Sequence, residues 1–189
     1  MADWLKKLFG SAGRASDGPG AGAAVPASDS PPELEADLLE AEAGARDLVD
    51  YLLSDRLFWQ LSLETPLGTR QPKMTLGSLY EHIDELKGSS SDLGDHDRQR
   101  LSTVVTAWEA ARRRYPTQVT AKLKRELDSY LKNWTYYLDQ RRQDPERWKE
   151  EYAVEVRNRR RVELVLTLLG PDAPPGLLED LLGLVGGGE

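Results

Sequence analysis

The chain of 189 residues contains no cysteine and only two histidines, His82 and His96. A chain without cysteine has no disulfide scaffold, no thiolate zinc site, no iron–sulfur cluster and no thiol nucleophile. Two histidines are too few for a metal site built from several imidazole ligands. Phosphate-binding loops, dinucleotide fingerprints and nucleophile elbows are also missing. We therefore expect no cofactor and no metal ion, and we expect that the protein is not an enzyme.

Long apolar runs are absent as well, since no stretch approaches the ~20 residues that span a bilayer. Charged residues are abundant but unevenly distributed around a net charge of −7. Residues 32–97 carry 15 acidic and 5 basic side chains, a net charge of −10. Residues 98–161 carry 17 basic and 9 acidic side chains, a net charge of +8. Either the two segments pack together and neutralise each other, or the basic segment presents a face to nucleic acid or anionic lipid.

The first 31 residues divide into a short amphipathic segment, residues 1–10, and a linker, residues 11–31. On a helix, the apolar side chains of the first segment share one face beside two lysines. The residues of this candidate docking element are Trp4, Leu5, Lys6, Lys7, Leu8 and Phe9. So short a helix is unstable alone in water. The segment therefore binds a membrane interface or a partner's groove, packs on its own domain, or stays disordered. The linker is rich in Gly, Ala, Ser and Pro and is predicted to be disordered.

Apolar residues at helical spacing recur through residues 32–170, where we expect one helical domain. The first helix begins at Ser30-Pro31-Pro32, a sequence typical of a helix start. Its apolar stripe continues through Leu61, with a break near Ser54-Asp55, and a loop follows. Four further helices are predicted over about residues 75–88, 96–115, 117–142 and 144–170.

No segment shows the alternation of a half-buried strand. Residues 171–189 add a short C-terminal helix and a flexible tail. The predicted fold class is therefore all-α, a bundle of about five main helices plus the short C-terminal helix, preceded by a disordered N-terminal linker. The core is expected to bury Trp108, Leu127, Trp134 and Leu166.

Basic residues cluster in the third, fourth and fifth predicted helices. Each cluster on its own is typical of a solvated helix face. Together they form an anionic-ligand surface if the helices present them on one side. The residues of this candidate surface are Arg112, Arg113, Arg114, Lys122, Lys124, Arg125, Arg141, Arg142, Arg157 and Arg160.

Aromatic residues next to arginine offer a second candidate. Trp134, Tyr136 and Tyr137 precede Arg141 and Arg142, and exposed aromatics beside arginine stack on nucleic-acid bases. Most aromatic residues of the chain lie on the apolar stripes, however, which predicts an aromatic-rich core instead. Whether Trp134 is buried or exposed decides between these interpretations.

Two further groups of charged residues have structural interpretations. Glu155, Arg159 and Glu163 are spaced four residues apart, which predicts a row of ion pairs, although a site for a charged small ligand is the alternative. The acidic residues around His82 lack the second Glu-x-x-His motif that a di-iron helical bundle requires. We therefore predict no metal site there.

These patterns favour a non-enzymatic helical adaptor or assembly protein of the cytoplasm, at most peripheral to a membrane or a larger assembly. Its expected partner is a protein, and weak contact with a membrane surface is a second expectation. The alternative function is a nucleic-acid-associated protein or regulator that uses the basic faces of the third to fifth helices.

Overall fold

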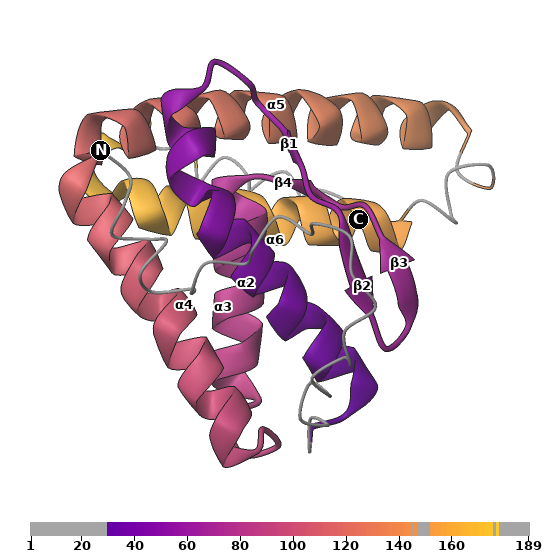
Figure 1. Cartoon of the computed structure of the whole chain (residues 1–189). Helices are drawn as coiled ribbons and strands as arrows, with labels where there is room; N and C mark the ends of the chain where they lie inside the picture. Colours follow the sequence, from indigo (N-terminus) through magenta and orange to yellow (C-terminus); the bar gives the residue numbers. More distant parts are fainter. Residues whose placement is uncertain (1–29, 145, 147–151, 176, 178–189) are drawn as a thin grey trace, which may run out of the picture. The chain divides into compact units, whose positions relative to one another are not determined.

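The computed structural model describes residues 30–144, 146, 152–175 and 177. The predicted docking segment 1–10, nearly all of the linker and most of the predicted C-terminal helix and tail lie outside these residues. The described part is mainly helical, which confirms the all-α prediction (Figure 1). Its helices are α2 (Pro32–Leu53), α3 (Leu76–Gly88), α4 (Asp95–Arg114), α5 (Pro116–Gln143), α6 (Tyr152–Leu169) and the short 3₁₀ helix η1 (Gly170–Asp172). No helix in the described ranges has the length and apolarity to cross a membrane.

The chain divides into two compact units, and the division runs through α3. The first unit comprises Met1–Met74 and His82–Tyr115, and the second comprises Thr75–Glu81 and Pro116–Glu189. The first half of α3 therefore belongs to the second unit, and the rest of α3 belongs to the first.

In the first unit, α2 packs against α4 (Figure 1). Small residues on α2, among them Ala41 and Ala45, are fully buried. Small side chains let packed helices approach closely. Trp108 of α4 is among the largest fully buried side chains. The prediction that Trp108 is buried is confirmed.

Residues 54–74 differ from the prediction. The break near Ser54-Asp55 is confirmed, because α2 ends at Leu53, but the predicted continuation of the helical stripe to Leu61 is wrong. Two short antiparallel ladders follow instead. They pair β1 (Trp59–Gln60) with β4 (Lys73–Met74) and β2 (Leu63–Thr65) with β3 (Gly68–Arg70).

The physical reason for this error is the length of the strands. Strands of two or three residues are too short to show an alternating pattern. Leu61 is buried after all, but it reaches the core from the ribbon rather than from a helix. Gly68, with φ of +103°, adopts the left-handed backbone that the tight turn into β3 requires.

In the second unit, α5 and α6 lie side by side and run in opposite directions (Figure 1). Leu127 and Trp134 of α5 and Leu166 of α6 are buried, as predicted. The predicted start of the last helix, at Asp144-Pro145-Glu146, adjoins residues that lie outside the described ranges. The Asp144 N–H donates to the carbonyl of Gln140 at the end of α5, and the described part of the last helix is α6, Tyr152–Leu169.

Candidate functional site

The predicted anionic-ligand surface is only partly present. Eight of its ten residues are exposed and Arg112 is half-buried; the exposed residues are Arg113, Arg114, Lys124, Arg125, Arg141, Arg142, Arg157 and Arg160. The prediction that Lys122 lies on the polar face is wrong, because its side chain is only 3% exposed. Position 122 falls on the buried stripe of α5, one turn after Val119 and one turn before Glu126.

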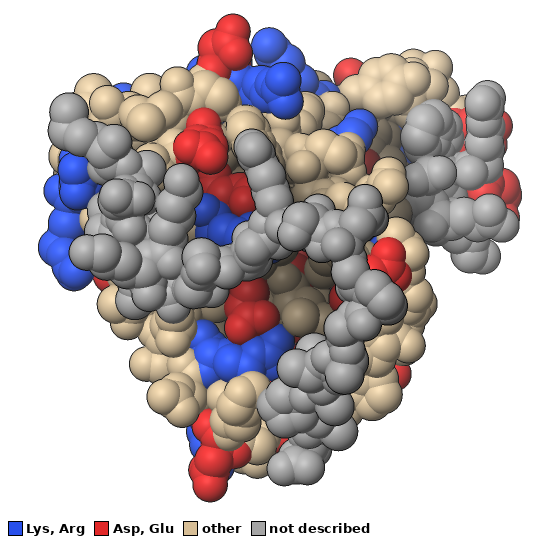
Figure 2. Space-filling view, viewed as in Figure 1, with Lys and Arg blue, Asp and Glu red and all other residues tan. Residues whose placement is uncertain are grey.

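The remaining basic residues are divided between the two units. Arg112, Arg113 and Arg114 belong to the first unit, and the others belong to the second. Several arginines have carboxylate partners on their own helix, among them Arg142 with Asp139. On the face shown in Figure 2, blue basic and red acidic side chains lie next to one another in several places.

The burial of the aromatic residues decides between the core and the base-stacking interpretations. Trp134 is 6% exposed and Tyr137 is 1% exposed, and their rings stack on each other with centroids 5.8 Å apart. Only Tyr136 of the three is exposed to solvent. The predicted aromatic-rich core is therefore confirmed, and the alternative of a base-stacking platform is wrong, because two of its three rings are in the core.

The predicted row of ion pairs on α6 is confirmed for one pair. Arg159 Nε lies 3.3 Å from Glu163 Oε1. Glu155 instead accepts a hydrogen bond from the Asn158 side chain. This row lies on the surface of α6, and in these contacts no residue of another helix or strand joins it to form a ligand site.

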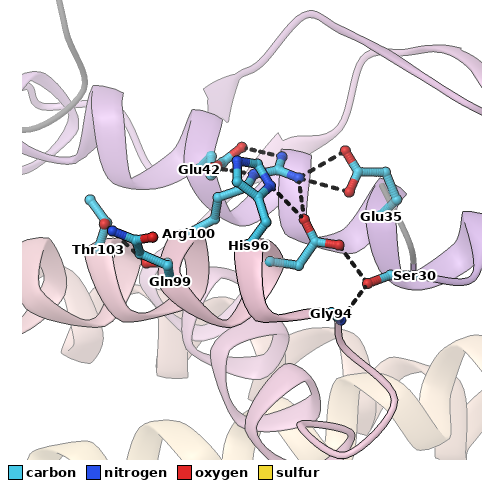
Figure 3. A network of polar contacts seen from close by, with 9 residues as sticks. Ser30, Glu35, Glu42, Gly94, His96, Gln99, Arg100 and Thr103 are labelled. Carbon is cyan, nitrogen blue, oxygen red and sulfur yellow. Dashed lines mark hydrogen bonds and ion pairs between the residues drawn. The ribbon is translucent and has the colours of Figure 1, made fainter. Parts of the chain in front are cut away.

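A network of polar contacts in the first unit surrounds Arg100 of α4 (Figure 3). Its guanidinium donates to both carboxylate oxygens of Glu42, at 2.9 and 2.7 Å. It also donates to both oxygens of Glu35 and to Asp97 Oδ1, at 2.8 to 3.0 Å. Burial lowers the pKa of Arg100, but the hydrogen bonds and negative charges of Glu42 and Glu35 outweigh this effect and raise the pKa.

The same network ties the start of α2 to the start of α4. The hydroxyl of Ser30 donates to Asp97 Oδ2 at 2.5 Å and accepts from the Gly94 N–H at 3.3 Å (Figure 3). Asp97 is 1% exposed and receives hydrogen bonds from both Ser30 and Arg100. Because every polar group here is engaged within the chain, the network acts as a structural connection between α2 and α4.

A second polar network lies in the core of the second unit. Glu126 of α5 accepts hydrogen bonds from the backbone N–H groups of Leu76 and Gly77, at 2.7 and 2.9 Å. These are two of the otherwise unpaired donors at the start of α3, so Glu126 caps this helix from a distant part of the chain. The Thr75 and Tyr130 hydroxyls lie 2.6 Å apart. Burial and the negative charge of Glu126 raise the pKa of Tyr130 to about 12.

Two close contacts extend this second network to α6. Arg161 Nε donates to Oε2 of the buried Glu81 at 2.7 Å. A Cβ added to Gly77 would lie 3.0 Å from Val165 Cγ2, so glycine allows the start of α3 to approach α6. Sequence reasoning missed Glu126, although its position on the apolar stripe of α5 was a signal that a carboxylate is buried there.

His82 takes part in a third polar group, in the first unit. Its Nε2 lies 3.2 Å from Glu40 Oε1, and its Nδ1 lies 3.8 Å from Asp37 Oδ1. The guanidinium of Arg70 lies 4.0 Å from both of these carboxylates. Among the described residues there is no group of three or more His, Cys, Asp or Glu side chains that could hold a metal ion.

The end of the α5–α6 hairpin is the strongest candidate for a functional surface. We use the name hairpin end for residues 136–144 together with residues 152–161. Beyond Tyr137 on α5 and before Val162 on α6, no described side chain is buried. Large apolar side chains are exposed there; they are Tyr136, Tyr152, Val154 and Val156.

An arginine covers part of this exposed apolar area. The Arg141 guanidinium lies 5.3 Å from the centre of the Tyr152 ring, within the range of a cation–π contact. This contact joins the last turn of α5 to the first turn of α6. The hairpin end therefore combines exposed aromatic, aliphatic and arginine side chains.

Comparison of the chain with protein-family models, with curated proteins and with solved structures finds no significant match.

Proposed function

We propose that this chain is a non-enzymatic helical adaptor or assembly protein, and that the hairpin end is its docking surface. The observation that carries the proposal is the exposure of large apolar side chains where α5 and α6 extend past the core. Tyr152 is 50% exposed, and Val156, one turn later on the same face of α6, is 43% exposed. Exposed apolar side chains that gather in one place are typical of an interaction site, whereas single ones are common on any surface.

The exposed side chains at the start of α6 do not all share one face. Val154 is two residues from both Tyr152 and Val156 and points about 200° around the helix axis, to the other side. The proposed contact therefore uses the face of Tyr152 and Val156, and Val154 is a separate exposed side chain.

The residue types at the hairpin end support docking of a protein. Tyrosine and arginine are enriched at the energetic centres of protein interfaces, because they combine a large contact area with hydrogen-bonding groups. Tyr136, Tyr152, Arg141 and Arg142 all lie here and all are exposed.

The predicted N-terminal docking segment, residues 1–10, is a second docking element in this proposal. It lies outside the described residues, so it rests on the amphipathic pattern alone. The nucleic-acid alternative has less support, because Lys122, Trp134 and Tyr137 are buried. A titration of nucleic-acid binding against salt distinguishes the alternatives, since phosphate contacts produce a steep loss of affinity with rising salt.

The experiment that tests the proposal is site-specific photocrosslinking of the full chain in its native cells. A photoreactive phenylalanine analogue replaces Tyr152, and in a control protein it replaces Leu67, an exposed residue in the turn between β2 and β3. We expect a crosslinked species of defined mass from position 152 that disappears when Val156→Glu is added. The absence of a crosslink, or equal crosslinks from both positions, would contradict docking at the hairpin end.

A further inference from the structure

We propose that His82 makes the contact between α3 and α2 sensitive to pH near neutrality. The protonated ring holds the two helices together, and the neutral ring weakens their contact. All the groups that take part lie in the first unit. The inference is independent of docking at the hairpin end, and its tests need no partner.

The geometry of the ring carries the inference. The two ring nitrogens of His82 face different carboxylates of α2: Nε2 lies 3.2 Å from Glu40 Oε1, and Nδ1 lies 3.8 Å from Asp37 Oδ1. The two carboxylates are three residues apart, so they share one face of α2. A neutral imidazole has a proton on only one nitrogen, whereas an imidazolium donates from both. Only the protonated ring therefore offers a proton to each carboxylate.

Partial burial makes the protonation state of this ring important. The side chains of His82 and Glu40 are each 16% exposed, and that of Asp37 is 32% exposed. Water solvates these charges incompletely, so an opposite charge close by has a larger effect than it would at an open surface.

The sum of the charges around the ring favours its proton. Asp37 and Glu40 together carry two negative charges, and the guanidinium of Arg70 of β3, 4.0 Å from each carboxylate, carries one positive charge. A neutral His82 leaves this group with one uncompensated negative charge, and a protonated His82 balances it. Arg70 opposes the proton, but it is 37% exposed and lies at the distance limit of an ion pair. The two carboxylates of α2 outweigh it.

The charged residues that follow His82 on α3 act in the same direction. Glu85 is three residues later and half-buried, so it shares a face with the ring. Asp84 is exposed on another side of the helix. On the ribbon, the carboxylate of Glu64 accepts a hydrogen bond from the Thr69 hydroxyl. These three residues are acidic, so none of them opposes a proton on His82.

The sign of the pH effect follows from these contacts. Histidine changes its charge between about pH 5 and 8. The unfolded chain does not hold the two carboxylates of α2 beside the ring, so the folded chain binds this proton more tightly. The resulting stabilisation is present below the titration range and is lost as the pH rises through it. Above that range, His82 keeps a hydrogen bond to α2 but loses its ion pairs.

The first experiment is urea unfolding of the full chain at about pH 6 and about pH 8, on either side of this titration. We expect the equilibrium constant for unfolding to be about 3- to 5-fold larger at the higher pH, the effect of a partly exposed ion pair. His82→Gln should remove most of this difference, because glutamine keeps a donor but never carries the charge. His96→Gln is the matched control, since the other histidine is 62% exposed, and it should keep most of the difference.

The second experiment measures opening of α3 directly. The chain has no cysteine, so the variant Leu86→Cys introduces a single thiol, one turn after His82 at a position that is 1% exposed. Its reaction rate with a thiol reagent is divided by the rate of free cysteine at the same pH. This ratio should be about 3- to 5-fold higher at the higher pH, in line with the first experiment. In the His82→Gln background it should be the same at both pH values.

A third variant tests the direction of the effect. Asp37→Asn combined with Glu40→Gln removes both carboxylates and leaves the ring beside Arg70, so the stability of this double variant should not fall between the two pH values. A fall that persists unchanged in the double variant or in His82→Gln would overturn the inference. So would a wild-type chain whose stability does not fall, or a thiol ratio that does not change with pH.

Discussion

Replacement of Arg100 by methionine should destabilise the first unit strongly. The substitution keeps the length of the apolar part of the side chain but removes the guanidinium from Glu35, Glu42 and Asp97. Asp97 is fully buried and the other two carboxylates are largely buried, so their charges are poorly solvated. Loss of one partner from a buried ion pair costs about 3–5 kcal/mol, because the remaining charge is uncompensated. We therefore expect Arg100→Met to lower the free energy of unfolding by about this amount.

Urea unfolding of the wild-type chain and of Arg100→Met near neutral pH measures this loss of stability. Arg46→Met is the matched control, because Arg46 is exposed and its ion pair with Asp47 lies at the surface. The control should cost less than about 1 kcal/mol. A loss below about 1 kcal/mol for Arg100→Met would refute the reasoning.

Three further predictions concern the second unit and the N-terminus. Trp134→Ala should lower the free energy of unfolding by about 3–5 kcal/mol, because it empties a large buried site; a denaturant titration with a loss under ~1 kcal/mol would contradict this. The free energy of unfolding should fall as the pH rises from 10 to 12, because the Tyr130 hydroxyl ionises in the unfolded chain but keeps its proton in the folded chain, where its pKa is about 12. This loss of stability should reach about 2–3 kcal/mol and should be absent in Tyr130→Phe. Deletion of residues 1–10 should leave the melting temperature unchanged; a marked decrease would mean that the segment packs on its own domain.

The helices were predictable from the sequence because their signals are long and mutually consistent. Apolar stripes of 18 residues or more mark α2, α4, α5 and α6. The ribbons between Trp59 and Met74 were not predictable, because a strand of two residues carries no period. Their apolar residues continue the spacing of α2 by coincidence, and only the break at Ser54-Asp55 indicated that the helix ends.

The polar contacts of the core were harder to predict than the helices. A charged residue on a helix can face solvent or a partner that is distant in sequence, and local spacing does not distinguish the two. Lys122 and Glu126 lie on the buried stripe of α5, whereas Lys124 and Arg125 lie on its exposed face. Partners such as Arg100 and Glu35 are 65 residues apart, so only the packing of α2 on α4 brings them together.

The Glu126 contact with the start of α3 has a consequence for dividing the protein. No single cut of the chain separates the two units, because Thr75–Glu81 belongs to the second unit but is followed by His82–Tyr115, which belongs to the first. A fragment that begins at Pro116 keeps Glu126 but lacks the N–H groups of Leu76 and Gly77 that satisfy its carboxylate. A fragment that ends at Tyr115 keeps those N–H groups but loses their acceptor. Each half thus carries an interaction that only the other half completes, so the two are expected to fold and unfold as one cooperative system.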